Sequence, residues 1–428
     1  MRETHTAIFV IEVNAMKIKL FFPILLLASF FPCAVWAQDF CGSVKSAQDI
    51  LNCALRNHPE IKLSASSLKR DELLKSIAKQ LPNPELDGSI LSGQPGNPHG
   101  VFIDMGITQA IELGGKRKNR IKQAIATEQL TRAQALESKE LTALNTVLAL
   151  YRLRQIRNEL AVINEASSTY RHILSNYKSR PKLAPEQEVS SSVFHLAQDE
   201  AKLKKTSLLQ EQISLLQFLT LATGLSDKQI LSQLPRGRRS WPKFSISKNQ
   251  EVLNSELAKA NADKAISEAN LKLAKSNAWP DFKLGSSFQT QTGITGKDSS
   301  AGVTFGLGIP IVSRNKSEIE YAKRDYAKSA LSYQLITQKN QSERIKQIRR
   351  YNQAIQSLHQ VQSTASINTG HENLEKYFTE GLLSASLVIE THRQLIELTE
   401  SKNIQELNAI DALWRLYIID GKIMEAKL

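Results

Sequence analysis

One order of features occurs twice in the sequence, at an offset close to 200 residues. The matched pairs are LPNPEL (81–86) with AWPDFKL (278–284), QAIELGGKRKNRIKQA (109–124) with GLGIPIVSRNKSEIEYA (306–322), and YKSRPKLAPEQEV (177–189) with YFTEGLLSASLVI (377–389). Each half therefore predicts a helix, two strands, a very long helix, a tight turn and another helix. A period this long indicates a duplicated domain and not a solenoid. We expect repeat 1 over 38–224, a linker or equatorial segment over 225–246, and repeat 2 over 247–428.

The predicted strands alternate apolar residues with small or polar ones. They cover about 84–91, 101–111, 280–290 and 301–312. Alternation with period two fits a strand that is apolar on one face, in a soluble sandwich or in a membrane sheet. Asp104 and Lys283 fall on the less apolar face. The turn-forming stretches LSGQPGNPHG (91–100) and TGITGKDSS (292–300) are expected to be loops.

The predicted long helices favour a membrane sheet over a soluble sandwich. Neither proline nor glycine interrupts Lys116–Tyr177 or Arg314–Thr369, so we expect helices over about 116–178 and 314–378. At ~1.5 Å per residue the first would be roughly 90 Å long. A 4-3 spacing typical of a coiled-coil seam follows Ile156, Leu160, Ile163, Ser167, Tyr170, Leu174 and Tyr177. Such helices cannot bury themselves in a compact domain, which favours a bundle or barrel wall. Four strands cannot close a membrane barrel, so other copies of the chain must close it.

The N-terminus is typical of a secretory signal. A short basic segment after Met16 precedes an uncharged run over 20–37, which predicts removal of residues 1–37, with translation starting at Met1 or Met16. A transmembrane anchor is the alternative, and Pro23 and Pro32 within the short apolar run disfavour it. Export favours a disulfide between Cys41 and Cys53, which would tether the N-terminal arm to the first helix. A metal site would need more ligands, and only His58 is near.

Net charge and motifs exclude several function classes. The formal charge of +13 suits an anionic lipid surface, whereas export disfavours nucleic acid. The turn around Gly115 and Lys116 is not a phosphate loop, because Ala110 replaces the first glycine and Arg117 replaces the hydroxyl residue. The sequence has no H-E-x-x-H, no G-x-S-x-G and no histidine pair at metal-binding spacing. We predict no enzymatic activity, no cofactor and no resident metal.

In their order and duplication, these features resemble the TolC-like outer-membrane factors, the exit ducts of Gram-negative efflux pumps and type I secretion systems. The resemblance covers nearly the whole mature chain and is carried by DILNCALRNHPEI, LGGKRKNRIKQA, FLTLATGL, GIPIVSRNKSEIEYA and YFTEGLLSASLVIETHRQL. It implies a mainly α fold with membrane β: a homotrimer with four strands per chain, forming a twelve-stranded outer-membrane β-barrel on a long periplasmic α-helical barrel. The GGKR turn is most similar to the heavy-metal branch, which works with RND-type pumps.

The resemblance implies that the two tight helix–helix turns are periplasmic tips, where an adaptor protein docks. The second tip matches the family's glycine-leucine-hydroxyl pattern at Glu380, Gly381, Leu382, Leu383 and Ser384. Gly381 would reverse the chain and Ser384 would cap the next helix. The first tip has proline where the pattern expects glycine, at Arg180, Pro181, Lys182 and Leu183. Docking is therefore expected chiefly at the second tip. The alternative for both turns is a plain capped helix hairpin with no docking role.

The resemblance also assigns the remaining candidate residues. Glu372 and Glu375, with Glu380, are candidates for a charged periplasmic aperture, and a solvated helix face would explain them as well. Asp104 and Lys283 are candidates for lining the barrel lumen. The strand-to-helix turns are expected at Gly114 and Gly115 in repeat 1 and at Pro310 and Ser313 in repeat 2. The basic residues that follow the first turn, Lys116, Arg117, Lys118 and Arg120, are expected near lipid headgroups or a neighbouring subunit.

The predicted function is a passive outer-membrane exit duct of a tripartite efflux system, carrying metal cations or drugs. Its expected partners are two further copies of the chain, a periplasmic adaptor, an inner-membrane RND pump or ABC transporter, and outer-membrane lipid. One alternative is the duct of a type I secretion or multidrug system. Another is a periplasmic coiled-coil adaptor, which predicts one hairpin and a lipoyl-like module instead of two matched halves. A structural coiled-coil protein would not need four alternating strands.

Overall fold

The computed structural model describes residues 41–428 apart from 43, 95–96, 239, 246–253, 294–295, 362–375 and 379. The predicted signal peptide lies outside the described residues.

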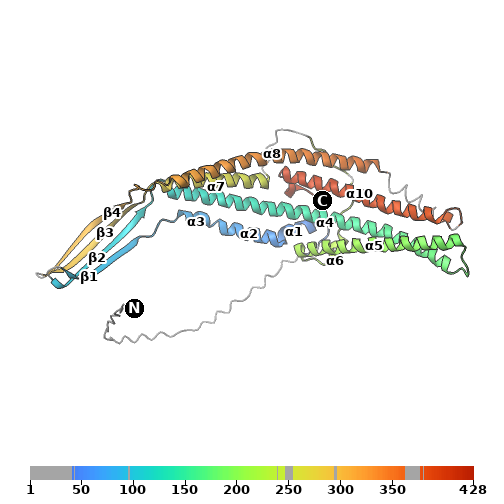
Figure 1. The fold of residues 1–428 in the computed structure, drawn as a ribbon, viewed down its shortest axis with the longest axis horizontal. Coiled ribbons are helices and arrows are strands. Elements are labelled where there is room, and N and C mark those ends of the chain that lie inside the picture. Colours follow the sequence, from blue (N-terminus) through green and yellow to red (C-terminus); the bar gives the residue numbers. More distant parts are fainter. Residues whose placement is uncertain are drawn as a thin grey trace, which may run out of the picture. The chain divides into compact units, whose positions relative to one another are not determined.

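The fold is mainly helical, with four strands in two hairpins and a duplicated helix-strand-strand-helix order, which confirms the predicted fold class (Figure 1). The first half contains α1 (Ala47–Asn57), α2 (Pro59–Asp71), α3 (Leu74–Lys79), β1 (Glu85–Gln94), β2 (Asn97–Ile111), α4 (Lys116–Lys178), α5 (Pro185–Thr223) and α6 (Asp227–Ser232). The second half contains α7 (Ser255–Asn277), β3 (Phe282–Gly293), β4 (Gly296–Leu307), α8 (Lys316–Gln360), α10 (Ala385–Ile419) and the 3-10 turn η1 (Ile423–Glu425). Two pairs of matching helices, α4 with α8 and α5 with α10, start 200 residues apart.

The strands form one antiparallel sheet in the order β1-β2-β3-β4. Register pairs such as Leu86 with Ile107, Met105 with Phe288, and Leu284 with Phe305 place apolar side chains on one face. The opposite face carries small and polar residues. Among the described residues β1 and β4 each pair with a single strand, so both outer edges of the sheet carry unpaired backbone groups.

Two predicted loops are in fact strand. β1 continues to Gln94 and β2 begins at Asn97, while β3 continues to Gly293 and β4 begins at Gly296. Ladder pairing extends to Gln94 with Asn97 and to Gly293 with Gly296, because backbone hydrogen bonds do not need apolar side chains. At the other end, β4 stops at Leu307 and not near residue 312. Gly308 and Pro310 follow directly, and proline cannot donate to a ladder.

Helix α4 is the element around which the other helices pack. At ~1.5 Å per residue its 63 residues span roughly 95 Å. It contacts α1, α2, α3, α5, α7 and α10, and α8 packs on α7 and α10. Among the described residues, no helix combines the length and the apolar character needed to cross a membrane.

The buried apolar residues form three clusters along α4. Two of them contain α4 residues between Ala143 and Leu153, together with residues of α1, α5, α6, α8, α10 and η1, and we call this part the central core. Trp414 and Tyr351 are among its fully buried side chains. The third cluster, the tip-side core, contains α4 residues from Ile163 to Leu174 with residues of α5 and α10. Burial of these faces, more than helix propensity, holds the long helices in place.

Candidate functional site

The less apolar face of the sheet carries both predicted lumen residues. Asp104 lies opposite Ser89 on β1 and Gln289 on β3. Lys283 forms an ion pair with Glu85 across the sheet, with Nζ 2.5 Å from Oε2. The register therefore brings both residues onto one polar face, and their lining of a lumen stays a prediction.

The first strand-to-helix turn is built by the predicted glycine pair. Gly114 and Gly115 have φ values of 69° and 77°, in the left-handed region that favours glycine. A Cβ on Gly114 would lie 2.8 Å from Cδ1 of Trp279 and 2.9 Å from the backbone oxygen of Ser276. The turn thus packs tightly against the end of α7, and Asn119 Nδ2 donates to Ser276 Oγ at 2.7 Å just beyond it.

The second strand-to-helix turn depends on a residue that was not predicted. Asn315 has φ 58° and directly precedes α8, at an offset of 200 from Gly115. Its side chain donates to the backbone oxygen of Ala274 at 2.9 Å. Asparagine tolerates the left-handed region better than most residues. Pro310 and Ser313, the predicted turn residues, lie in the exposed segment between β4 and Asn315.

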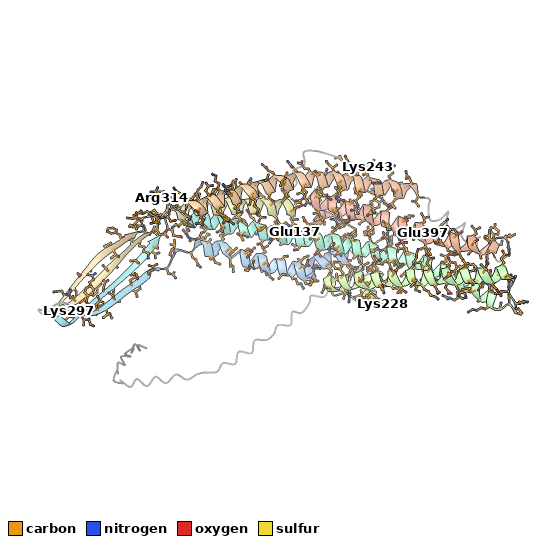
Figure 2. All side chains as sticks on the ribbon, viewed as in Figure 1. Glu137, Lys228, Lys243, Lys297, Arg314 and Glu397 are labelled. Atoms are coloured by element: carbon orange, nitrogen blue, oxygen red, sulfur yellow. A yellow bond between two sulfur atoms is a disulfide. The ribbon has the colours of Figure 1, made fainter. Side chains whose placement is uncertain are left out.

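Three of the four basic residues after the first turn have partners within the chain. Lys116 Nζ lies 2.7 Å from Asp281 Oδ1, and Arg117 Nε donates to the backbone oxygen of Lys79 at 2.8 Å. Arg120 forms an ion pair with Glu112. These bonds join the start of α4 to the segments leading into β1 and β3 and to the end of β2. Figure 2 shows the corresponding end of α8 at Arg314, and Lys297 at the opposite end of the sheet.

The second tip turn closes by backbone hydrogen bonds around Gly381. Gly381 has φ 75°, its N–H donates to Phe378 O at 3.0 Å, and Leu382 N–H donates to Tyr377 O at 2.9 Å. This is the Schellman arrangement that ends many helices at glycine. Ser384 stands at the cap position of α10, but its hydroxyl makes no capping bond and lies 2.9 Å from Ser386 Oγ. Glu380 and Leu382 are exposed and Leu383 is half-buried.

The first tip turn is built differently. Arg180 N–H donates to Tyr177 O at 3.2 Å, and the Arg180 guanidinium lies 5.9 Å from the centre of the Tyr177 ring. Pro185 begins α5, and the Ala184 N–H is capped by Gln187 Oε1 at 3.2 Å. The predicted docking residues here are Arg180, Pro181 and Lys182, which are exposed, and Leu183, which is half-buried. Glu372 and Glu375, the remaining aperture candidates, lie outside the described residues.

An aromatic cluster joins the two tips. Phe194 on α5 lies 5.8 Å from the Tyr170 ring of α4 and 6.0 Å from Phe378, which immediately precedes the second tip. Tyr170 also lies 5.4 Å from the His392 ring of α10. Sequence reasoning missed this cluster, although the aromatic residues at 170 and 177 in the predicted seam pointed towards it.

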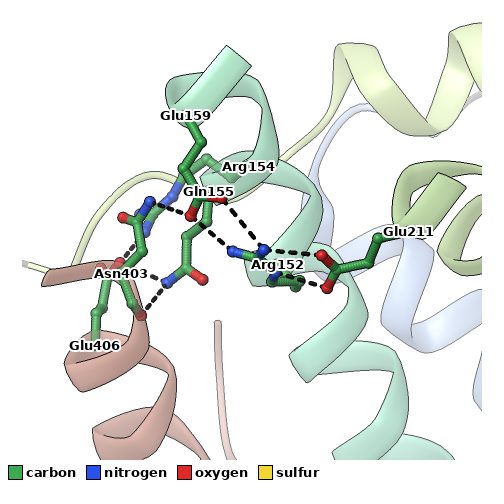
Figure 3. Close-up of polar contacts among 7 residues, drawn as sticks. All are labelled: Arg152, Arg154, Gln155, Glu159, Glu211, Asn403 and Glu406. Atoms are coloured by element: carbon green, nitrogen blue, oxygen red, sulfur yellow. Dashed lines mark hydrogen bonds and ion pairs between the residues drawn. The ribbon is translucent and has the colours of Figure 1, made fainter. Parts of the chain in front are cut away.

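A set of polar residues, which we call the polar layer, lies between the central core and the tip-side core (Figure 3). Its members are Arg152, Arg154, Gln155 and Glu159 of α4, Glu211 of α5, and Asn403 and Glu406 of α10. All of them are largely buried except Glu211, whose side chain is 42% exposed. Burial by itself lowers the pKa of Arg152, but hydrogen bonds to Glu211 and Glu159 outweigh it and raise that pKa above its ordinary value. The group therefore stays charged inside the protein.

At the start of the described chain, Cys41 and Cys53 form a disulfide, with their Cα atoms 5.8 Å apart. Asn57 Nδ2 lies 3.0 Å from Cys41 Sγ. Cys53 is fully buried in α1, so the disulfide fixes the arm before α1 on the central core. Within the part of the chain that the structure describes, no group of three or more His, Cys, Asp or Glu residues is placed to hold a metal ion.

Comparison with known proteins gives matches to solved structures only. No protein-family model matches the chain, and no curated protein matches it. The CmeC outer membrane channel of Campylobacter jejuni matches over 88% of this chain and 86% of its own, with a TM-score of 0.69 and 13% identity. The chain has the fold of a TolC-like outer-membrane channel. Similar matches are CusC (TM-score 0.60, 14% identity, 93% and 95% covered) and the open state of MtrE from Neisseria gonorrhoeae (0.62, 12%, 88% and 89%).

Proposed function

We propose that this chain is a TolC-like outer-membrane factor that forms the passive exit channel of a tripartite efflux system. The proposal is carried by one observation: the matches to the solved channels CmeC and CusC cover 88% and 93% of a chain built from two strand hairpins and long helices. The proposed protein spans the outer membrane, extends into the periplasm and has no enzymatic activity.

The open sheet supports assembly into a closed trimer. β1 and β4 leave backbone groups unpaired along both edges, and in a membrane each such group costs several kcal/mol. Three copies joined edge to edge supply twelve strands and leave no edge. The apolar face would then meet lipid, since side chains such as Val303 and Phe305 are 75% and 79% exposed in the single chain. Asp104 and Lys283 would face the lumen.

The helical part would form the periplasmic section of the channel, ending at the two tips. We propose the second tip, residues 380–384, as the principal docking site for a periplasmic adaptor protein, and the first tip, residues 180–183, as a secondary one. The left-handed Gly381 and the exposed Glu380 and Leu382 present a short projecting turn that suits such a contact. An inner-membrane pump would supply the energy.

For the cargo we propose metal cations, moved by an RND-type pump, with drugs as the second candidate. The support is the GGKR turn, which is similar to that of the heavy-metal branch. CusC and CmeC match this chain at 14% and 13% identity, so these matches do not favour one cargo over the other.

Cell fractionation and a resistance assay test the proposal together. The protein should be recovered from outer membranes as a heat-sensitive trimer, and a deletion strain should become sensitive to metals, dyes or detergents. Glu380→Lys should lower resistance while trimer yield is unchanged; Glu60→Lys, a charge reversal on α2, is the matched control. Recovery as a soluble periplasmic monomer would contradict the channel. Full resistance with Glu380→Lys would contradict the docking site alone.

A further inference from the structure

Buried polar side chains of α4 are concentrated between its two apolar cores. The central core ends on α4 near Leu153 and the tip-side core starts at Ile163. Between them α4 buries Ile156, but also three polar side chains, Arg154, Gln155 and Glu159, and the Glu159 side chain is only 5% exposed. Figure 3 shows that side chains from α4, α5 and α10 meet at this level.

The bonds of the polar layer connect α4 to two other helices. Arg152 is the link to α5: its Nε lies 2.7 Å from Glu211 Oε1, and its Nη1 lies 2.7 Å from Glu159 Oε1. Glu159 in turn accepts a hydrogen bond from Asn403 Nδ2 of α10 at 2.8 Å. Arg152 and Glu159 of α4 therefore connect this helix to α5 on one side and to α10 on the other through one continuous set of hydrogen bonds.

A second set of bonds joins α4 to α10 directly. Arg154 forms an ion pair with Glu406, and both side chains are largely buried. Gln155 Nε2 donates to the backbone oxygen of Asn403 at 2.9 Å and lies 3.1 Å from Glu406 Oε2. One bond to a backbone oxygen fixes the position of the α10 chain itself, and not only of a side chain.

Such a layer contributes little to stability, but it is well suited to fixing the axial alignment of packed helices. Buried ion pairs pay a desolvation penalty that apolar residues of similar size avoid, and their best-attested use is to select one alignment of packed helices. A shift of one turn, about 5.4 Å, between purely apolar helix faces would leave no charge without a partner. Directional bonds to buried charges do not survive such a shift, because each group would be left without its partner.

We propose that the polar layer is a register lock, which fixes α5 and α10 axially against α4 at the level where the central core ends. Rearrangements of the tip segments, such as those that would open the proposed channel, stop at this layer; this consequence rests on the proposed function. The lock itself is a property of the folded chain and is testable without transport.

Cross-linking of cysteine pairs placed on α4 and α10, on the tip side of the layer, measures the axial alignment of these two helices. Tyr170→Cys is combined with His392→Cys, the native neighbour, or with Val388→Cys or Ile396→Cys, one turn to either side. The protein without residues 1–37, which include Cys33, is treated with a short bifunctional thiol reagent; its remaining native cysteines, Cys41 and Cys53, are already joined. With the layer intact, the 170–392 pair should be the dominant product.

The lock variant replaces Arg152 and Arg154 by Met and Glu159 and Glu406 by Leu, which leaves the net charge unchanged. Cross-linking of the shifted pairs should rise several-fold in this background. The matched control removes an exposed ion pair of α10 with Arg393→Met and Glu397→Leu and should keep the native pattern. An unchanged native pattern in the folded lock variant overturns the proposal.

A charge swap keeps the test decisive if the lock variant does not fold. Glu406→Arg alone places two cations together and should raise the shifted products, whereas Glu406→Arg with Arg154→Glu restores the pair and should restore the native product. Native cross-linking in the single variant, or no restoration in the double variant, overturns the lock. Neither result bears on whether the protein is a channel, which fractionation tests separately.

Discussion

The substitution Gly114→Ala tests the geometry of the first strand-to-helix turn. The new methyl group meets two obstacles in the structure: a backbone with φ 69° and atoms of Trp279 and Ser276 within 2.9 Å. Gly115→Ala is the matched comparison, because its φ is 77° but a Cβ there would meet nothing within 4 Å. The two variants therefore share the backbone strain and differ in the contact.

The expected magnitudes follow from these two terms. Left-handed backbone costs an alanine about 1–2 kcal/mol, and forcing a methyl group into a packed site costs about 1–3 kcal/mol more. Gly114→Ala should therefore destabilise by about 2–5 kcal/mol and Gly115→Ala by about 1–2 kcal/mol. Gly115→Asn should cost less than Gly115→Ala, since Asn315 adopts the same conformation at the matching position.

Thermal unfolding of the detergent-solubilised protein, followed by far-ultraviolet circular dichroism, measures the difference. At ~2–4 °C per kcal/mol, Gly114→Ala should lower the apparent Tm by roughly 4–20 °C and Gly115→Ala by roughly 2–8 °C. The order of the three variants is the critical result. Equal losses for the two alanine variants would refute the contact with Trp279, and a larger loss for Gly115→Asn than for Gly115→Ala would refute the equivalence of the two turns.

Three further predictions concern the central part of the fold. Cys41→Ser, which breaks the bond to Cys53 across a separation of 12 residues, should cost about 3 kcal/mol, and a reductant should destabilise the wild type but not this variant. Burial raises the pKa of Glu140, so its stabilising contribution is present at low pH and is lost as pH rises through that raised pKa; Glu140→Gln should have a higher Tm than the wild type at neutral pH and the same Tm in acid. Arg344→Met should cost about 3–5 kcal/mol because Asp420 loses its buried partner, and adding Asp420→Leu should recover most of that loss in the same melting assay.

The repeat was the most informative sequence feature, because both halves of the structure contain the same order of helices and strands. The duplicated order of helices and strands is present, and matching helices start 200 residues apart. The alternation in the strands predicted the two faces of the sheet, since register follows the pattern of side chains. Strand ends were less predictable. Polar residues in 91–100 and 292–300 predicted loops, but the ladder extends to Gln94 with Asn97 and to Gly293 with Gly296 without apolar side chains.

The second strand-to-helix turn was only partly readable. Pro310 and Ser313 predicted the turn because proline and serine are common in turns. The residue with the left-handed backbone is instead Asn315. An alignment at an offset of 200 would have placed Asn315 opposite Gly115, and both residue types tolerate that conformation. The repeat therefore indicates the position of the left-handed residue, whereas the local composition does not.

The polar layer could not be predicted from the sequence, because its members are far apart in the chain. Arg152 and Glu159 look like charges on a solvated helix face, and Glu211 and Glu406 lie 59 and 252 residues from their arginine partners. Only the packing of α5 and α10 on α4 brings them together. Whether a charged side chain is buried depends on the residues packed around it. For the polar layer these residues come from both repeats, so a local stretch of sequence does not reveal the burial.

The offset of 200 also shows that the layer is confined to one place in the duplicated fold. Tyr151 and Tyr351 occupy matching positions and are both buried, so the two halves share the central core at this level. One turn further, Arg154 matches Ala354 and Glu159 matches His359, and so α8 lacks the charges that α4 carries. The layer joins α4 to α5 within the first repeat and to α10 of the second. Arg154 and Glu406 lie at non-equivalent positions of the two halves, so neither half alone contains this contact.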